Sequence, residues 1–140
     1  FEPTDHLHVI RVRTEGDKTF VQVKHGIAET DDVKSSMEYA TEVSDHDALV
    51  KILQLMGHEV IDCFEKERTS YEFEDCRLEF DKPRGKYGYI PVYLELESDA
   101  SDNIYRCLEQ LEIAKENALP WTGADLIKHY ESLSGSSSEE

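Results

Sequence analysis

Charged residues keep to alternate positions in six short stretches of the chain, with apolar residues between them. Three stretches are basic and three are acidic: Arg11 and Arg13, Lys24, Lys66 and Arg68, then Glu38 and Glu42, Glu79 and Asp81, Glu95 and Glu97. Successive side chains of a β-strand point to opposite faces, so each stretch would present one ionic and one apolar face. Arginine and lysine bind phosphate oxygens, and carboxylates are hard ligands of the kind that Mg²⁺ prefers. The two sets together favour the binding of a metal-bound polyphosphate.

An exposed antiparallel sheet would explain the same alternation without any ligand. Opposite charges can pair across strands on a wetted face, although such pairs contribute only about 0–1 kcal/mol each. From alternation alone this is the simpler interpretation. The segregation of the two signs onto different strands favours the ligand-binding interpretation, because a solubilising surface more often mixes the signs within each strand.

Six predicted strands would position these residues, and they span 6–14, 18–24, 37–43, 59–73, 76–82 and 90–98. The predicted helices begin at Ser44, at Ser101 or Asp102 and at Thr122, and the second of them runs toward Pro120. Two intervening segments, 25–36 and 83–89, are predicted as loops. The second of these loops is expected to be mobile because it is rich in glycine.

This order of elements predicts an α+β fold with an antiparallel sheet. Amphipathic helices need an apolar sheet face to cover, and the strands offer only one, so the ionic residues should face away from the helices. If the sheet curls with its ionic face inward, it encloses a tunnel lined by both charge signs. We expect one domain over residues 1–133, followed by a disordered tail over 134–140.

Charge and composition exclude several classes of function. The 140 residues carry a formal net charge of −16, which opposes general binding to nucleic acid because no basic stripe is available to displace counterions. No apolar run approaches the roughly 20 residues that would cross a bilayer, and no leader is apparent, so we expect a cytoplasmic protein without membrane contact. The three cysteines lack metal-ligand spacing, which argues against a zinc site, and their odd number argues against a complete disulfide framework.

An ordered series of motifs carries a family resemblance. The motifs are Arg11-x-Arg13, Lys24, Glu38 and Glu42 before a strand-to-helix switch, Gly57, Glu65-Lys66-x-Arg68-Thr69-x-Tyr71, Asp81 at a strand end and Glu95-x-Glu97. Their order and spacing over residues 1–133 resemble the CYTH superfamily. That superfamily includes class IV adenylate cyclases and thiamine triphosphatases.

The resemblance implies an antiparallel β tunnel that binds a triphosphate together with Mg²⁺ or Mn²⁺. Carried over by position, the phosphate-binding residues would be Arg11, Arg13, Lys24, Lys66 and Arg68, with Lys66 and Arg68 also catalytic. The metal ligands would be Glu42, Asp81, Glu95 and Glu97, with Glu38 as a further member. The implied substrates are ATP, thiamine triphosphate or tripolyphosphate, and the implied reaction is either cyclisation or hydrolysis.

One family motif has no counterpart in this sequence. The Glu-x-Glu-x-Lys strand that begins the family's tunnel is absent, which is expected of either a fragment or a natural short form. A non-catalytic nucleotide- or polyphosphate-binding module is therefore the alternative to an enzyme. A missing strand would also leave a sheet edge unpaired, and such an edge favours pairing between two chains in a homodimer.

Overall fold

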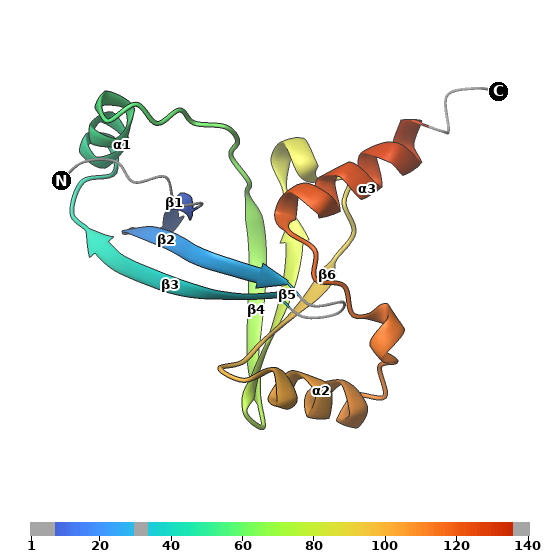
Figure 1. Ribbon diagram of the computed structural model, residues 1–140. Coiled ribbons are helices and arrows are strands. Elements are labelled where there is room, and N and C mark those ends of the chain that lie inside the picture. The colour runs from blue at the N-terminus through green and yellow to red at the C-terminus, as the bar shows by residue number, and fades with distance from the viewer. Residues whose placement is uncertain (1–7, 30–33, 136–140) are drawn as a thin grey trace. The chain divides into compact units, whose positions relative to one another are not determined.

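The computed structural model of the chain describes residues 8–29 and 34–135. The chain divides into two compact units, which we call the N-terminal unit (1–30 and 34–61) and the C-terminal unit (31–33 and 62–140). Each unit contains one antiparallel sheet of three strands (Figure 1). The antiparallel α+β class expected from the sequence is confirmed.

Strands β1 (His8–Glu15), β2 (Lys18–Glu29) and β3 (Lys34–Val43) form the N-terminal sheet in that order. The turn between β1 and β2 contains Gly16 at a φ of 58°, a conformation that glycine adopts without strain. The loop predicted over 25–36 is wrong at both of its ends, because β2 continues to Glu29 and β3 begins at Lys34. A register shift between His25 and Ala28 interrupts the alternation there, which explains why the pattern was not apparent.

Helix α1 (His46–Leu55) follows β3 directly. Its N-cap is Asp45 rather than the predicted Ser44, because the Asp45 carboxylate accepts a hydrogen bond of 2.9 Å from the backbone N–H of Ala48. Gly57, at a φ of 91°, follows the end of the helix as the sequence predicts.

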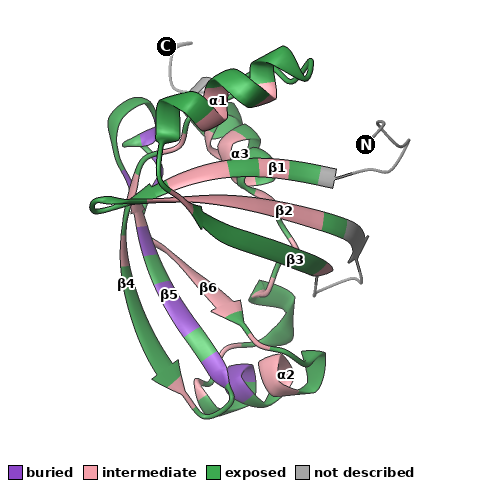
Figure 2. Ribbon diagram, turned by 90° about the vertical axis from the view of Figure 1, so that its left-hand side faces the viewer, coloured by how far each residue is buried: buried purple, intermediate pink, exposed green. Residues whose placement is uncertain are grey.

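Strands β4 (Lys66–Phe73), β5 (Cys76–Pro83) and β6 (Tyr93–Glu97) form the C-terminal sheet, with β5 in the centre. Figure 2 shows β5 as the strand that carries most of the buried positions. The strand predicted from residue 59 begins only at Lys66, where it pairs with Pro83. One further backbone bond follows, from the N–H of Arg84 to the carbonyl of Glu65 at 2.8 Å, before Gly85 turns the chain at a φ of 57°. The strand predicted over 90–98 is likewise shorter.

Helix α2 (Ser101–Gln110) covers the apolar face of this sheet (Figure 1). The buried cluster joins Cys76 and Leu78 of β5 to Cys107 of α2, and the residues packed against it are Phe73, Leu94, Leu96, Ile104 and Leu111. The helix ends well before Pro120, because Glu112 adopts a φ of 56° that no helix can continue. The predicted placement of a helix away from the ionic residues is therefore confirmed for α2.

The loop after β5, predicted to be mobile from its glycines, is held by side-chain contacts. Lys82 Nζ donates to the carbonyl of Gly88 at 3.2 Å and to that of Ile90 at 3.0 Å. Tyr87 is buried and stacks on Phe64 with ring centroids 5.2 Å apart. These contacts tie the loop to β5 and oppose the expected mobility.

Helix α3 (Gly123–Gly135) is the last described element. Thr122 and Asp125 bond reciprocally at its start, as in a capping box. The predicted tail begins inside this helix, and its residues 136–140 lie outside the described part of the chain. Across the described residues, no helix combines the length and apolar character needed to cross a bilayer.

The three thiols differ in accessibility, which leads to a testable prediction. Cys63 is exposed, whereas Cys76 and Cys107 are buried, and burial raises the pKa of the Cys107 thiol to about 11, with Cys76 adding to the shift. Because the thiolate is the reactive form, we expect iodoacetamide at pH 8 to modify one thiol rapidly in the folded protein. The other two should react only after unfolding in guanidinium, as mass spectrometry would detect. Rapid modification of all three in the native state would contradict the described core.

Candidate functional site

The strand register gathers charged side chains on one face of the C-terminal sheet. Arg68 lies opposite Asp81, and Glu79 lies opposite Glu95. Directly opposed residues share a face and neighbours alternate. Beyond the exposed Glu72–Arg77 pair at its end, this face carries Lys66, Arg68, Glu79, Asp81, Tyr93, Glu95 and Glu97, which we call the ionic face of β4–β6.

Asp81 is the anchor of the two basic residues. It is fully buried, and Arg68 donates two hydrogen bonds of 2.7 Å to its carboxylate, from Nε to Oδ1 and from Nη2 to Oδ2. Lys66 Nζ also donates a hydrogen bond to Oδ2. Burial alone would raise the pKa of Asp81, but the hydrogen bonds from Arg68 and Lys66 outweigh it and hold that pKa below its usual value. The hydrogen bond with Asp81 is also the main reason why the pKa of Arg68 is raised. The carboxylate thus stays ionised and fixes both cations on the face.

Three other carboxylates form a compact cluster beside this anchor. Ligand oxygens of Glu79, Glu95 and Glu97 lie within 4.8 Å of one another, and Glu79 is only 4% exposed. Burial, followed by repulsion from Glu97, raises the pKa of Glu79 above its usual value. Three like charges this close disfavour one another unless a cation joins them.

The carboxylate cluster fits a hard divalent cation. It offers oxygen ligands alone, which suits Mg²⁺ or Mn²⁺. Glu79 Oε2 is buried without a hydrogen-bond partner among the described residues, although Arg68 Nη1 lies within ion-pair distance of it. We regard this atom as ion-paired but not satisfied, because the guanidinium approaches without hydrogen-bond geometry.

Of the predicted residues, five come together on this face: Lys66, Arg68, Asp81, Glu95 and Glu97. The two basic residues also approach the cluster, because Arg68 Nη2 lies 3.4 Å from Glu95 Oε2 and Lys66 Nζ lies 3.6 Å from Glu95 Oε1. Asp81 is predicted as a metal ligand, but its oxygens already accept the bonds of Arg68 and Lys66. Glu79 takes its place in the cluster.

Sequence reasoning did not assign two residues of this face to the site. Glu79 shares the parity of Asp81, and Tyr93 shares that of Glu95, so the alternation itself was a signal for both. Tyr93 is half-buried, with Lys66 Nζ 6.0 Å from its ring centroid. Burial, followed by repulsion from Glu95, raises the pKa of Tyr93, so its hydroxyl remains protonated.

The remaining predicted residues share one face of the N-terminal sheet, with Arg11 opposite Gln22, Lys24 opposite Glu38 and Phe20 opposite Glu42. Alternation places Arg13 on the same face. Lys24 Nζ lies 2.9 Å from Glu38 Oε1, and Glu42 is paired with Lys18 at 3.5 Å. Burial alone would raise the pKa of Glu38, but the hydrogen bond from Lys24 contributes to a net lowering.

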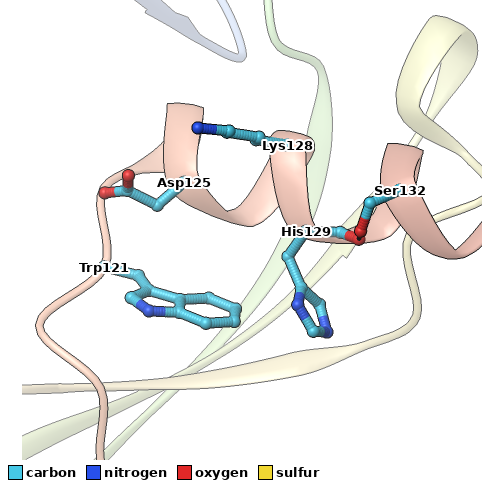
Figure 3. A pocket seen from close by; sticks show the side chains of 5 residues that line it. All are labelled: Trp121, Asp125, Lys128, His129 and Ser132. Atoms are coloured by element: carbon cyan, nitrogen blue, oxygen red, sulfur yellow. Dashed lines mark hydrogen bonds between the residues drawn. The ribbon is translucent and has the colours of Figure 1, made fainter.

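A groove along α3 is lined by none of the predicted site residues (Figure 3). It has a volume of about 300 Å³ and is lined by Trp121, Asp125, Lys128, His129 and Ser132. The rings of Trp121 and His129 lie 4.8 Å apart. Asp125 accepts hydrogen bonds from Thr122 at the start of the helix, so helix capping accounts for its position.

Comparison with known proteins gives one family and related folds. A family model described as CYTH domain matches residues 1–137. The structure of the PH1012 protein from Pyrococcus horikoshii OT3 is similar, with a TM-score of 0.70, 18% identity, and coverage of 91% of this chain and 76% of that chain. A conserved hypothetical protein from Pyrococcus furiosus is similar with a TM-score of 0.70, 19% identity, and coverage of 90% and 77%. A search among curated proteins gives no significant match.

Proposed function

The chain belongs to the CYTH domain family, and from this premise we propose that it binds and turns over a triphosphate-containing small molecule with a divalent cation. Proteins of this family generally bind triphosphates in a tunnel and use divalent metals. One observation supports the proposal most directly. On the ionic face of β4–β6, the two cations held by Asp81 adjoin the carboxylate cluster of Glu79, Glu95 and Glu97.

The burial on this face favours a ligand site over an exposed salt-bridge sheet. A wetted surface would leave its carboxylates in solvent, whereas Asp81 is 0% and Glu79 is 4% exposed. Burying carboxylates is costly unless they are paired or bind a cation. Asp81 is paired with Lys66 and Arg68, and Glu79 retains an oxygen without a hydrogen bond.

The proposed roles follow from chemistry. Lys66 and Arg68 would orient the polyphosphate chain and neutralise part of its charge, and Asp81 would fix both side chains in place beforehand. Glu79, Glu95 and Glu97 would hold Mg²⁺ or Mn²⁺, which when bound supplies further charge neutralisation at phosphate oxygens. We include Arg11, Arg13 and Lys24 as further phosphate ligands, and Glu42 as a further metal ligand, from the family resemblance alone.

Incubation with substrates tests the proposal and separates the two reactions. The protein would be incubated in turn with ATP, thiamine triphosphate and tripolyphosphate in the presence of Mn²⁺, and the products analysed by ion-exchange chromatography. Cyclic AMP with pyrophosphate would identify a cyclase, whereas orthophosphate would identify a triphosphatase. Binding of tripolyphosphate without any product would point to the non-catalytic module, and neither binding nor turnover would overturn the proposal.

A further inference from the structure

We propose that a divalent cation and the Arg68 guanidinium compete for the same carboxylates, so that cation binding releases Arg68 to contact phosphate. The inference rests on the proposed function, because it concerns how the two ligands of that site depend on each other. It assigns Arg68 a second role, as the group that links occupancy of the carboxylate cluster to phosphate binding.

The contacts of Arg68 carry the argument. Its Nη1 forms an ion pair with Glu79 Oε2, and its Nη2 lies 3.4 Å from Glu95 Oε2. Both carboxylates belong to the cluster whose oxygens lie within 4.8 Å of one another. A cation bound by Glu79, Glu95 and Glu97 would therefore use the same carboxylates that Arg68 contacts, and the two positive charges would repel each other.

Glu79 shows that the guanidinium is an imperfect substitute for a metal ion. Its Oε2 atom is buried in a residue only 4% exposed, yet it has no hydrogen-bond partner among the described residues. A buried ionised oxygen without a hydrogen bond is unfavourable, and coordination to a cation would satisfy it. Although this atom is paired in charge with Arg68 Nη1, its missing hydrogen bond is the sign that the cluster is built for a ligand rather than for Arg68 alone.

Asp81 keeps Arg68 in place when the other contacts are lost. The bonds of 2.7 Å from Nε and from Nη2 to Asp81 are separate from the contact of Nη1 with Glu79. Displacement from the cluster would therefore free Nη1 without freeing the whole side chain. Released in this way, the guanidinium would present a donor to a phosphate oxygen from a fixed position.

The charge on the face adds to the same dependence. Four carboxylates (Glu79, Asp81, Glu95 and Glu97) share this side of the sheet with Lys66, Arg68 and Arg77, and Arg77 is already paired with Glu72, so negative charge is in excess until a cation binds. A polyanion would be repelled by this face without metal. Coupling between two binding sites is reciprocal. If the bound cation makes Arg68 available to phosphate, then phosphate bound to Arg68 must in turn raise the affinity of the cluster for the cation.

Metal affinity in the absence of phosphate tests the inference. The free Mn²⁺ concentration would be followed by electron paramagnetic resonance during titration of the intact protein, for the unchanged chain and for Arg68→Gln. Removal of the competing guanidinium should tighten Mn²⁺ binding about tenfold, within the usual range of coupling between sites. If Arg68 had only a structural role, its removal would disturb the carboxylate cluster, and Mn²⁺ would bind more weakly.

Arg77→Gln is the matched control. Arg77 carries the same charge on the same face but pairs with Glu72, its Nε lying 3.1 Å from Glu72 Oε1. Its removal should change Mn²⁺ affinity about twofold at most, because the Arg77 side chain is exposed and solvent screens its charge from Glu97 on the neighbouring strand. If Mn²⁺ binding tightened equally in Arg68→Gln and Arg77→Gln, the loss of one positive charge would explain the result, and the inference would be overturned.

Arg68→Lys keeps the test decisive if Arg68→Gln fails to fold. The lysine retains a cation for Asp81 but lacks the second arm that reaches Glu79, so Mn²⁺ binding should still tighten several-fold. Unchanged or weaker binding in a folded Arg68 variant would overturn the inference and leave the proposed function standing. Absence of Mn²⁺ binding in every variant would overturn both.

Discussion

Changing Glu95 and Glu97 together to glutamine is expected to lower triphosphate turnover by at least about 100-fold at limiting Mg²⁺. Two of the three charges of the carboxylate cluster would be lost, and neutral amides are poor ligands for a hard cation. The protein should remain folded, because both residues are less buried than Glu79 and their repulsion of Glu79 disappears. Initial rates measured over a Mg²⁺ titration would show the loss, and excess metal should restore part of the activity.

A matched double variant separates this effect from a change in net charge. Glu67→Gln with Glu72→Gln removes the same two charges from β4, but these carboxylates pair with Arg84 and Arg77 rather than with the cluster. Its activity should stay within about twofold of the unchanged protein, as expected for exposed pairs. If both double variants keep comparable activity at low Mg²⁺, the cluster is not the metal site.

Changing Asp81 to asparagine is expected to lower the free energy of unfolding by about 3 kcal/mol. The carboxylate is fully buried and binds both Arg68 and Lys66, so its loss leaves two cations without their main partner. The expected cost lies at the lower end for broken buried pairs, because the side chains of Lys66 and Arg68 remain 25% and 24% exposed and keep contacts with Glu95. Urea denaturation followed by circular dichroism would measure it.

Asp75→Asn provides the comparison at an exposed position. Asp75 approaches Arg106 only at 3.9 Å, and both side chains are largely exposed, so less than about 1 kcal/mol should be lost. A loss in Asp81→Asn no larger than this would show that the buried pairs contribute little to folding. Phosphate binding in Asp81→Asn should also weaken, since Lys66 and Arg68 would no longer be held in position.

Alternation predicted which residues share a face, but not which of them would meet. Glu79 and Asp81 lie two positions apart on one strand and look equivalent in the sequence. The register sets them apart, because Asp81 faces Arg68 across the ladder, whereas Glu79 lies between Ser70 and Glu95. One therefore became the partner of the cations and the other joined the carboxylates, a distinction that depends on cross-strand pairing.

Element ends were harder to predict than element types, for local reasons. The stretch before Lys66 is rich in apolar residues, but its last ladder bond joins the N–H of Arg84 to the carbonyl of Glu65, and Gly85 then turns the opposite strand away at a φ of 57°. Helix α2 ends where Glu112 adopts a positive φ, a backbone conformation that is uncommon for glutamate and so is not expected from the sequence. In both cases tertiary pairing or a backbone conformation decided the boundary, and neither is visible in residue type.

The contact of Trp121 with His129 of α3 has an optical consequence. This indole is the sole tryptophan of the chain, so tryptophan emission reports the surroundings of α3 and not those of the N-terminal unit. Dichroism, by contrast, records the backbone of both units. Superposition of the two signals during denaturation would identify one cooperative transition, and a displacement between them would reveal units that melt independently.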